Sequence, residues 1–423
     1  MNVLVLGSGG REHAVAWKLS RSKKLKKLFI APGNAGTNEI GININLNTKD
    51  FKCIEKFILK ENVNIVFVGP ENIIVEGIYD YLKSKLPKLI VIAPSKQASL
   101  LEGSKKFAKE FMQKYNIPTA NYASFKKNEF ENAVKYLKTI SAPYVLKADG
   151  LAGGKGVVIL DDPFEAEQQL KAMLLDNKFG AASNEVLIEE FLSGIELSVF
   201  VLTNGIDYKM FPIAKDYKRI GEGDVGLNTG GMGSVSPVPF ANEKLIKKIE
   251  NSIIKPTISG IKNEKIEYCG FIFFGLINVN GEPKVIEYNV RLGDPETQVV
   301  LPRIESDLIE LFSSIEEEEK FKLASLEISN KYCSAVILTS KGYPEKYAIG
   351  YSISGIDKSY KKSLIFHAGT KKEKKEILTN GGRVLAISSF GKNLKESVAN
   401  CYKTIKTIDF DGMYCRKDIG LDL

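Results

Sequence analysis

The chain has 423 residues, 44% hydrophobic and 26% charged, and its 59 basic and 51 acidic side chains give a net charge of +8. This composition excludes a disordered or fibrous protein, and the length suits several domains of about 150 residues each. The basic surplus lies in short lysine runs such as 371–375 without an aromatic stripe. These runs argue against nucleic acid and indicate a solvated surface, with an anionic substrate as the alternative. The longest apolar runs are too short to cross a bilayer.

The cysteines and histidines indicate the compartment. Five cysteines form no CxxC pair, and His13 and His367 are the only histidines in the sequence. This argues against a disulfide framework and a zinc site, and it fits a reducing compartment. The chain begins with a strand-like apolar run in place of a secretory signal. We therefore expect a soluble cytoplasmic protein.

Residues 1–101 repeat one strand–helix unit. Apolar runs end at Gly7, Ala31, Gly69 and Ala93, and segments with helical periodicity lie between them. Such alternation predicts a parallel sheet covered by helices on both faces. Ligands bind such sheets at the carboxyl ends of the strands. The candidate substrate residues that follow these ends are Gly9, Gly10, Asn34 and Glu71.

The loop over residues 7–13, Gly-Ser-Gly-Gly-Arg-Glu-His, looks like a dinucleotide-binding loop, but two features argue against that interpretation. Glu12 stands where a third small residue is needed, and it would crowd the helix against the strand and repel a pyrophosphate. The second strand ends in Pro32-Gly33-Asn34, without an acid for ribose hydroxyls. A sugar monophosphate suits the loop better, and a plain β-to-α turn is the alternative.

The central region begins with a helix predicted from Glu102-Gly-Ser-Lys105 to Tyr115. A block of helix 129–139, strand 144–148, strand 157–160, helix 163–174 and strand 185–190 follows. Its first two strands are joined by Lys147-Ala-Asp-Gly-Leu-Ala-Gly-Gly-Lys-Gly156. Glycines let backbone N–H groups approach phosphate oxygens, and two lysines offset the charge of a polyphosphate. A flexible surface hairpin is the alternative.

The segment Glu287-Tyr-Asn-Val-Arg291 is predicted to be a strand with two distinct faces. Alternation turns Ile286, Tyr288 and Val290 toward a core, and Glu287, Asn289 and Arg291 toward the opposite face. Burying such a polar row without a ligand is costly. Two oxygen donors at i and i+2 suit magnesium on phosphates, and the arginine suits an anion. A solvated outer face is the alternative.

Two further segments carry candidate residues. The strand ending in Glu189 and Glu190, followed by Phe191, Leu192 and Glu196, is typical of a hinge at an adenine edge with acids for ribose. Asp216-Tyr-Lys-Arg219 precedes the glycine-dense stretch 221–233, which we expect to form an active-site lid. The last hundred residues are predicted to be short strands, including 333–339 and 383–388, and a helix over 394–406.

Together these motifs resemble the ATP-grasp superfamily and, more closely, the glycinamide ribonucleotide synthetase (phosphoribosylamine–glycine ligase) family. The likeness runs in family order from residue 1 to Gly420. The motifs that carry it are Gly7-Ser-Gly-Gly-Arg-Glu-His13, Ala31-Pro-Gly-Asn-Ala-Gly36, Glu102-Gly-Ser-Lys105, Lys147 to Gly156, Asn228-Thr-Gly-Gly-Met-Gly233 and Glu287-Tyr-Asn-Val-Arg-Leu-Gly-Asp-Pro-Glu-Thr-Gln298.

The resemblance implies a multidomain α/β fold. Its parts would be an N-terminal parallel α/β sheet domain (1–101), a central α+β ATP-grasp pair, and a small C-terminal mixed α/β domain (326–423). The pair would comprise a main subdomain (102–120 and 191–325) and a lid subdomain (121–190). The implied reaction, in de novo purine biosynthesis, joins glycine to 5-phosphoribosylamine with ATP through a glycyl phosphate.

The implied site has four sets of residues. The nucleotide would be bound by Lys105, Lys147, Gly153, Gly154, Lys155, Gly156, Glu189, Glu190, Phe191, Leu192 and Glu196. The substrates would be bound by Gly9, Gly10, Asn34, Glu71, Asn228, Thr229, Gly230, Gly231, Asp294, Pro295 and Glu296. The catalytic set is Arg291, Lys218, Arg219 and Asp216. Glu287 and Asn289 would hold Mg²⁺ or Mn²⁺. The expected partners are small substrates alone, without nucleic acid or membrane, and a monomer is expected.

Some positions depart from the family pattern. Tyr217 replaces a usual histidine, which argues against proton transfer there, and residues 270–279 supply no acid as a third metal ligand. Lesser departures lie at Ile73, Gly153 and Ile195. The competing interpretations are another ATP-grasp ligase or carboxylase, a nucleotide-binding module without turnover, and a nicotinamide oxidoreductase built on the first domain.

Overall fold

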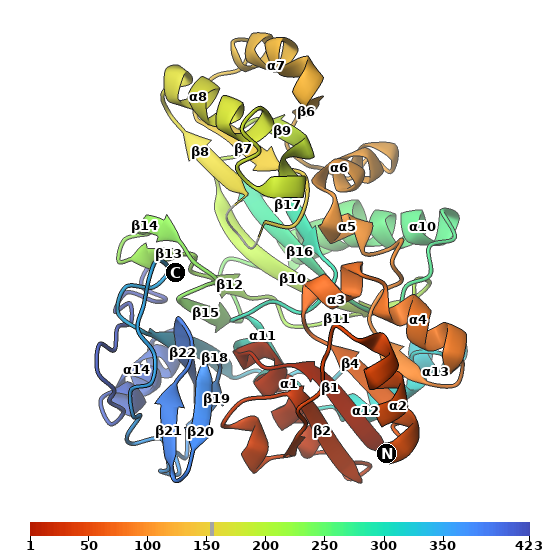
Figure 1. The fold of residues 1–423 in the computed structure, drawn as a ribbon, viewed down its shortest axis with the longest axis vertical. Coiled ribbons are helices and arrows are strands. Elements are labelled where there is room, and N and C mark those ends of the chain that lie inside the picture. Colours follow the sequence, from red (N-terminus) through yellow and green to blue (C-terminus); the bar gives the residue numbers. More distant parts are fainter. Residues whose placement is uncertain (153–155) are drawn as a thin grey trace.

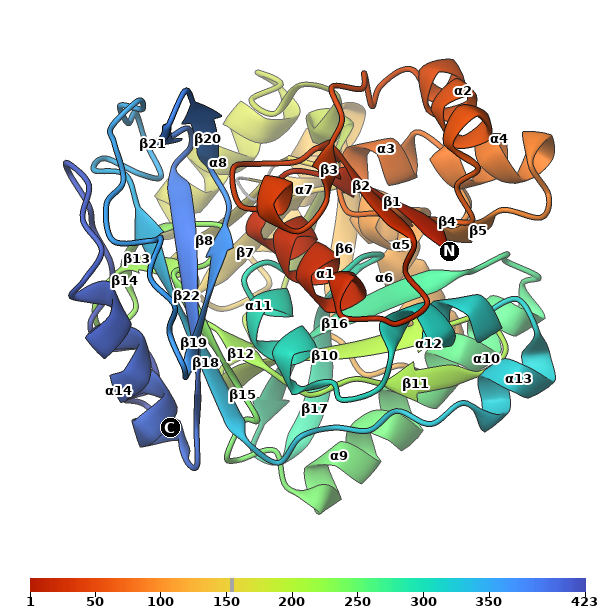
Figure 2. The ribbon, with the colours of Figure 1, turned by 90° about the horizontal axis from the view of Figure 1, so that it is seen from below.

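The computed structural model describes residues 1–152 and 156–423 (Figure 1). Its N-terminal sheet is parallel throughout, in the order β3-β2-β1-β4-β5. The elements are β1 (Asn2–Gly7), α1 (Gly10–Ser20), β2 (Lys27–Pro32), β3 (Ile42–Asn43), α2 (Phe51–Glu61), β4 (Ile65–Val68), α3 (Glu71–Val75), α4 (Ile78–Lys85) and β5 (Ile90–Ile92). Figure 2 shows α1 on one face of this sheet and α2 and α4 on the other. The parallel sheet predicted from the continuous apolar runs is confirmed.

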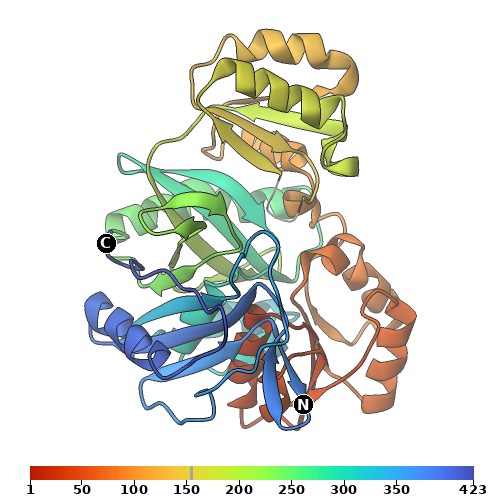
Figure 3. The same cartoon turned by 60° about the vertical axis from the view of Figure 1, so that its left-hand side comes forward.

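A second unit, residues 121–190, stands apart at the top of Figures 1 and 3, and we call it the lid unit. Its antiparallel sheet has the order β6-β9-β7-β8. The elements are β6 (Tyr122–Lys126), α7 (Phe130–Leu137), β7 (Tyr144–Ala148), β8 (Val157–Leu160), α8 (Pro163–Leu174) and β9 (Glu185–Glu189). The unit has its own core around Leu146, Leu170 and Ile188. The chain enters it near residue 120 and leaves it near residue 190.

A four-stranded antiparallel sheet, ordered β11-β10-β16-β17, lies beneath the lid unit. The elements around it are α5 (Leu100–Gly103), α6 (Lys105–Lys114), β10 (Ile195–Thr203), β11 (Tyr208–Met210), α9 (Glu243–Ile249), α10 (Lys255–Asn263), β16 (Gly270–Val279) and β17 (Glu282–Asn289). The single helix predicted from Glu102 is in fact two helices. The break falls at Ser104, whose side chain caps α6 by accepting the N–H of Phe107.

The predicted alternation along β17 is wrong at one residue. Gly275 pairs with Glu287 and Leu276 with Val285, so Ile286 is an extra residue in a β-bulge. Val285 is therefore fully buried and Ile286 only partly, although Tyr288 faces the core as expected. A bulge changes the face of the sheet to which the residues beyond it point. Its position depends on the pairing of β17 with β16, so the local sequence of β17 does not reveal it.

The C-terminal sheet has the order β12-β15-β18-β22-β19. Its strands are β12 (Lys215–Asp216), β15 (Gly233–Ser236), β18 (Tyr332–Thr339), β19 (Ser363–His367) and β22 (Arg383–Gly391), and α14 (Leu394–Ile405) packs on it. Two hairpins form separate two-stranded sheets, β13 (Arg219–Gly221) with β14 (Val225–Asn228) and β20 (Thr370–Glu373) with β21 (Glu376–Thr379). The segment between β17 and β18 forms α11 (Thr297–Val300), α12 (Leu308–Ser314) and α13 (Glu318–Leu323), of which α12 contacts α1 and β5 of the N-terminal domain. Two of its strands, β12 and β15, come from the middle of the chain. The sheet packs against α1 through Ala14, Trp17 and Phe366. Within the described residues, no helix has the length and apolarity that a membrane crossing needs.

Candidate active site

Three lysines from three parts of the fold surround the carboxylate of Glu287. Lys105 begins α6, Lys147 lies in β7 of the lid unit, and Lys218 follows β12. Burial raises the pKa of Glu287, but the ammonium groups of Lys218, Lys147 and Lys105 outweigh it and hold that pKa below its ordinary value. The local excess of positive charge suits a polyanion, because each added phosphate oxygen would meet an ammonium group.

The carboxylate of Glu189 is almost fully buried beside two lysines. Its Oε2 lies 3.0 Å from Nζ of Lys147 and 3.0 Å from Nζ of Lys109. Its Oε1 is buried and has no hydrogen-bond partner among the described residues. Lys109 was not predicted as a site residue, because a lysine on an amphipathic helix is usually solvated. Glu189 thus holds two lysines through Oε2, and its Oε1 can still accept a hydrogen bond.

The other acids of the predicted hinge are already engaged. The carboxylate of Glu190 accepts bonds from the backbone and side-chain N–H groups of Asn121, at 3.1 and 3.0 Å. Glu196 pairs with Lys218 at 2.6 Å. Phe191 is 41% exposed, so its ring is available to a planar ligand. The two acids thus hold protein groups, and their expected contact with ribose hydroxyls stays a prediction.

The glycine-rich loop is described only in part. Gly153, Gly154 and Lys155, all predicted to bind phosphates, lie outside the described residues. Gly156 is buried, and its carbonyl accepts the N–H of Ala148 at 2.8 Å. A Cβ at Gly156 would stand 2.7 Å from the Cβ of Ala152, so the loop closes too tightly here for a larger residue.

Arg291 is held by two carboxylates. Its Nη2 lies 3.0 Å from Oε1 of Glu102, and its Nε lies 3.5 Å from Oε2 of Glu71. The same Nη2 donates to Oδ1 of Asn289 at 3.1 Å. Glu102, not predicted as a site residue, also accepts the N–H of Val290 at 2.8 Å. Arg291 therefore fixes the edge that carries Asn289, and its predicted role in binding an anion stays a prediction.

Two further acids lie close together near Lys218. Burial raises the pKa of Glu296 to about 7, and the neighbouring carboxylate of Asp216 adds to this effect. Ser198 donates to Oε1 of Glu296 at 3.0 Å. Burial likewise raises the pKa of Asp216. A pair of acids that repel each other in a buried position is well suited to receive a cation such as an ammonium group.

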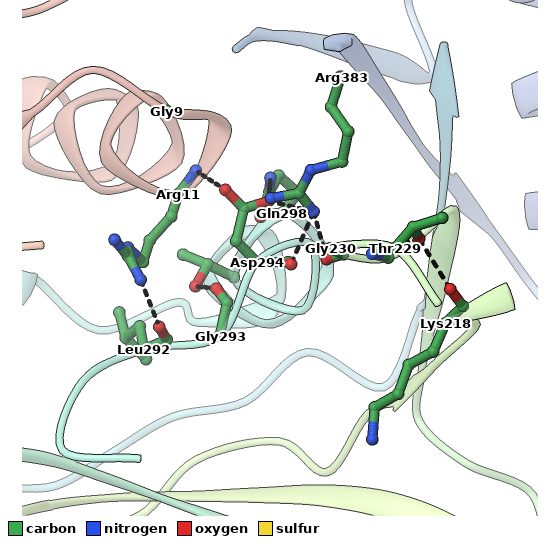
Figure 4. A network of polar contacts seen from close by, with 12 residues as sticks. Gly9, Arg11, Lys218, Thr229, Gly230, Leu292, Gly293, Asp294, Gln298 and Arg383 are labelled. Atoms are coloured by element: carbon green, nitrogen blue, oxygen red, sulfur yellow. Dashed lines mark hydrogen bonds and ion pairs between the residues drawn. The ribbon is translucent and has the colours of Figure 1, made fainter. Parts of the chain in front are cut away.

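Asp294 joins three regions of the chain, as Figure 4 shows. Its Oδ2 accepts the N–H of Arg11 at 3.4 Å, and its Oδ1 accepts Nε2 of Gln298 at 2.7 Å. Nη1 of Arg383 lies 3.3 Å from Oδ1 and also donates to the Gly230 carbonyl. Burial raises the pKa of Asp294, but Arg383 and Arg11 outweigh it and hold the pKa low. This carboxylate is a structural junction between α1, the turn after β17, and β22.

The predicted lid segment 228–231 is tied down at several points. The N–H and hydroxyl of Thr229 both bond to the Lys218 carbonyl at 2.8 Å. The Gly230 N–H donates to the hydroxyl of Tyr343 at 2.9 Å. Gly231 has a φ of +112°, and a Cβ there would stand 2.3 Å from Pro295. Asn228 pairs with Arg219 at the base of the exposed β13–β14 hairpin.

The first glycine loop is filled by its own side chains. The Gly9 N–H donates to Oε2 of Glu12 at 2.7 Å, and a Cβ at Gly10 would stand 2.5 Å from Nε2 of Gln298. A Cβ at Gly69 would stand 1.9 Å from Oε1 of Glu12. These glycines therefore make room for Glu12 and Gln298, and the assignment of the Gly9-Gly10 loop to the ribose phosphate stays a prediction.

The Asn34 side chain is also fully engaged. Its amide nitrogen donates to the carbonyls of Ser8 and His367, each at 2.8 Å. Its Oδ1 accepts the N–H groups of Gly36 and Thr37, each at 3.0 Å. An amide has two donors and two acceptor positions, so none is left for a substrate. The side chain joins the N-terminal loops to β19, and its predicted role in seating the ribose phosphate stays a prediction.

A cavity of about 510 Å³ lies between the N-terminal loops and the β20–β21 hairpin. Its lining includes Ser8, Asn34, Thr370, Lys371 and Lys372. The run 371–375 was predicted to be a solvated surface, with an anionic substrate as the alternative, and two of its lysines line this cavity. Hydrogen bonds between residues more than 300 positions apart, from Asn34 to the His367 carbonyl and from the His367 N–H to His13, hold the segment before the hairpin against the N-terminal loops, which no local pattern reveals.

Tyr217, where the family usually has histidine, lies in the hydrophobic core of the C-terminal sheet. It is 2% exposed, and its hydroxyl donates to Oδ1 of Asp422 at 2.5 Å and accepts the Gly420 N–H at 3.0 Å. Nζ of Lys215 lies 3.7 Å from the ring centroid. The side chain thus packs into the C-terminal core, consistent with the absence of a proton-transfer role.

The candidate metal ligands are oxygen donors at one strand edge. Nδ2 of Asn289 lies 3.4 Å from Oε1 of Glu287, so the two side chains are adjacent. In the part of the chain that the structure describes, no group of three or more His, Cys, Asp or Glu residues could hold a metal ion. The donor set therefore suits a hard cation that keeps most of its ligands from phosphates and water.

Lysines that converge on a carboxylate of the central antiparallel sheet, one of them from a separate lid unit, are the arrangement of an ATP-grasp enzyme, an ATP-dependent ligase. The chain matches the family models for phosphoribosylglycinamide synthetase: the N domain over residues 1–102, the ATP-grasp (A) domain over 103–297 and the C domain over 333–422. It belongs to this family.

Whole-chain relatives agree with that assignment. The chain is 45% identical to phosphoribosylamine–glycine ligase of Fusobacterium nucleatum, over 99% of this chain and 98% of the relative. It is 44% identical to the ligase of the same name from Clostridium acetobutylicum, over 99% of each. The crystal structure of phosphoribosylamine–glycine ligase from Thermotoga maritima superposes with a TM-score of 0.84 at 33% identity, over 99% of this chain and 100% of that one.

Proposed function

We propose that this ATP-grasp ligase joins glycine to 5-phosphoribosylamine through a glycyl phosphate, releasing ADP and phosphate, in cytoplasmic purine biosynthesis. The observation that carries the proposal is the convergence of Lys105, Lys147 and Lys218 on Glu287, beside the Asp216–Glu296 pair. Glycine's carboxylate is a poor acylating agent until its oxygen is phosphorylated. The lysines would offset the charge that develops on the transferred phosphoryl group.

The nucleotide is assigned to the side of Glu287 that faces the lid unit. Lys105 and Lys147 would bind the phosphates, and the unpartnered Oε1 of Glu189 would accept the adenine amino group. Glu287 and Asn289 fit magnesium or manganese, because nearby lysines keep the carboxylate ionised and the amide oxygen adjoins it. The ion would neutralise phosphate charge and orient the terminal phosphate.

Glycine is assigned to the region between Lys218 and the paired acids. Its ammonium group would lie against Asp216 and Glu296, whose mutual repulsion a cation relieves. Its carboxylate would then be directed to Lys218 and Arg219 and toward the terminal phosphate. The amine of phosphoribosylamine attacks the carbonyl carbon, the new C–N bond forms, and the C–O bond to phosphate breaks as phosphate leaves. Positioning these two reactants is worth up to about 7–11 kcal/mol of the barrier.

The sugar phosphate is assigned to the cavity between the N-terminal loops and the β20–β21 hairpin. Lys371 and Lys372 supply positive charge there, and Thr370 supplies a hydroxyl. Ser8 of the lining is followed directly by Gly9, where an added Cβ would stand 3.4 Å from Oδ2 of Asp294. The cavity thus begins beside the turn that carries Glu296, so a substrate can extend from it toward the acids.

Isotope transfer tests the proposal. Glycine labelled with ¹⁸O in its carboxylate is turned over with ATP, magnesium and phosphoribosylamine, and the released phosphate is analysed by mass spectrometry. One labelled oxygen per phosphate supports the glycyl phosphate, and unlabelled phosphate during turnover rejects it. Unlabelled glycine in ¹⁸O-water is the control for hydrolysis of ATP. Formation of ADP without phosphoribosylamine or glycine would favour a different ATP-grasp acceptor.

A further inference from the structure

Lys109 lies in the middle of α6 with only 2% of its surface exposed. Its Nζ lies 2.9 Å from the Thr119 hydroxyl, 3.0 Å from the Ala120 carbonyl and 3.0 Å from Oε2 of Glu189. An ammonium group has three donors, so each has an acceptor. Burial lowers the pKa of Lys109 to about 8, although Glu189 opposes this effect. Such a fully satisfied buried lysine indicates a specific structural task.

The three acceptors lie at both chain crossings of the lid unit. Thr119 and Ala120 immediately precede the entry at Asn121, and Glu189 is the last residue of β9 before the exit. The Thr119 hydroxyl donates in turn to the Val285 carbonyl at 2.7 Å, and Thr119 bridges to Val285 in β17. One ammonium group therefore connects the entry, the exit and the strand that carries Glu287.

A separate contact joins the crossings on their solvent side. The Glu190 N–H donates to the Asn121 carbonyl at 3.0 Å, while its carboxylate accepts from Asn121. Glu190 is more than a third exposed in its side chain, so this contact is exchangeable with water. The buried contact through Lys109 is shielded from such exchange. It reaches the Glu189 carboxylate directly, at 3.0 Å.

We propose that Lys109 is a positioning residue that holds both hinges of the lid unit and keeps Glu189 from taking Lys147 out of the nucleotide site. Lys109 and Lys147 share the same oxygen, Oε2 of Glu189. Without Lys109, that carboxylate turns wholly to Lys147, and less of the ammonium charge reaches the phosphates. The inference rests on the proposed nucleotide site at Glu189 and Lys147.

The test compares Lys109→Met, which keeps the unbranched stem, with Lys114→Met as the control. Lys114 lies on the same helix and is exposed, paired with Glu264 on the surface. We expect Lys109→Met to raise KM for ATP about tenfold and leave KM for glycine within about twofold. Lys114→Met should change neither. Lys109→Arg should not rescue, because a planar guanidinium cannot meet three acceptors arranged around one ammonium.

A double-mutant cycle tests whether Lys109 acts through Glu189. On a Glu189→Gln background, Lys109→Met should change KM for ATP by less than about twofold. An unchanged KM in folded Lys109→Met, an equal rise for every substrate, or additive effects with Glu189→Gln would each overturn the inference. If Lys109→Met does not fold, Thr119→Val removes one acceptor and should raise KM for ATP to a smaller extent.

Direct binding separates this inference from the proposed function. Calorimetric titration with ATP and magnesium measures the nucleotide site without turnover. If the wild-type chain binds ATP but does not ligate glycine, the proposed function fails and the binding data still test Lys109. If binding is equal in wild type and Lys109→Met, the inference fails and the proposed function stands.

Discussion

The two histidines meet where the N-terminal and C-terminal sheets join. Their ring centroids are 5.6 Å apart, and Nδ1 of His13 accepts the backbone N–H of His367 at 2.8 Å. Gly36 lies against both rings, since a Cβ there would stand 2.3 Å from His13 and 2.5 Å from His367. Burial lowers the pKa of His13 to about 3, with His367 adding to the effect, and lowers that of His367 to about 4.

These pKa values predict a loss of stability in acid. Unfolded histidine titrates near 6.5, so below that pH the unfolded chain binds protons that the folded chain does not. The free energy of unfolding therefore falls as the pH drops from about 6.5 toward 4. At pH 5, about 1.5 units below the unfolded value, each histidine costs about 2 kcal/mol and the pair costs about 4 kcal/mol.

Two measurements test this reasoning. Because the sequence contains two histidines, NMR of protein labelled with ¹⁵N-histidine follows both rings directly. Urea unfolding at pH 7 and pH 5 compares the wild type with His13→Asn, whose amide oxygen replaces Nδ1 as the acceptor. The variant should lose about 2 kcal/mol less on acidification. A ring that titrates near 6.5 in the folded protein, or equal losses in the two proteins, would refute the assignment.

Three further changes test the site. Glu287→Gln should lower the rate of ADP formation at least about 100-fold with little change in the melting temperature, and a rate within tenfold of wild type would contradict the metal assignment. Ser198→Ala removes the bond that opposes the raised pKa of Glu296, so the acid limb of kcat/KM for glycine should move to higher pH; an unmoved limb would mean that Glu296 does not control it. Lys371→Ala combined with Lys372→Ala should raise KM for phosphoribosylamine about tenfold and leave KM for ATP unchanged, since charge-assisted bonds to phosphate are lost; equal changes in both KM values would point to misfolding.

Local patterns were enough to predict the elements and the strand-end residues. The apolar run before Gly7 and the alternation around Tyr288 depend on neighbours a few residues away. Lys147 and Glu287 could be singled out for the same reason, since charged groups that end buried strands are costly unless something binds them. The resemblance to a known family then related the motifs, in their order along the chain, to the expected domains.

The sequence could not predict which donors and acceptors of the candidate residues are already hydrogen-bonded to other protein groups. Gly9 and Asn34 look available until the structure shows Glu12 and the loop carbonyls already bonded to them. Glu102 and Lys109 look like ordinary helix charges until packing buries them against Arg291 and Glu189. A hydrogen bond uses up a donor or an acceptor, and the partner is often more than a hundred residues away.

The amino-acid sequence by itself determined most of the strands and helices, the positions of the glycine-rich loops and the row of polar side chains at residues 287–291, because each depends on contacts within one or two turns of chain. Only the tertiary structure decided how distant segments meet. It placed the bulge at Ile286, buried Lys109 between both crossings of the lid unit, and brought Lys371 to the lining of a cavity. Burial removes the water that would otherwise screen a charge, and burial depends on the packing of the whole chain.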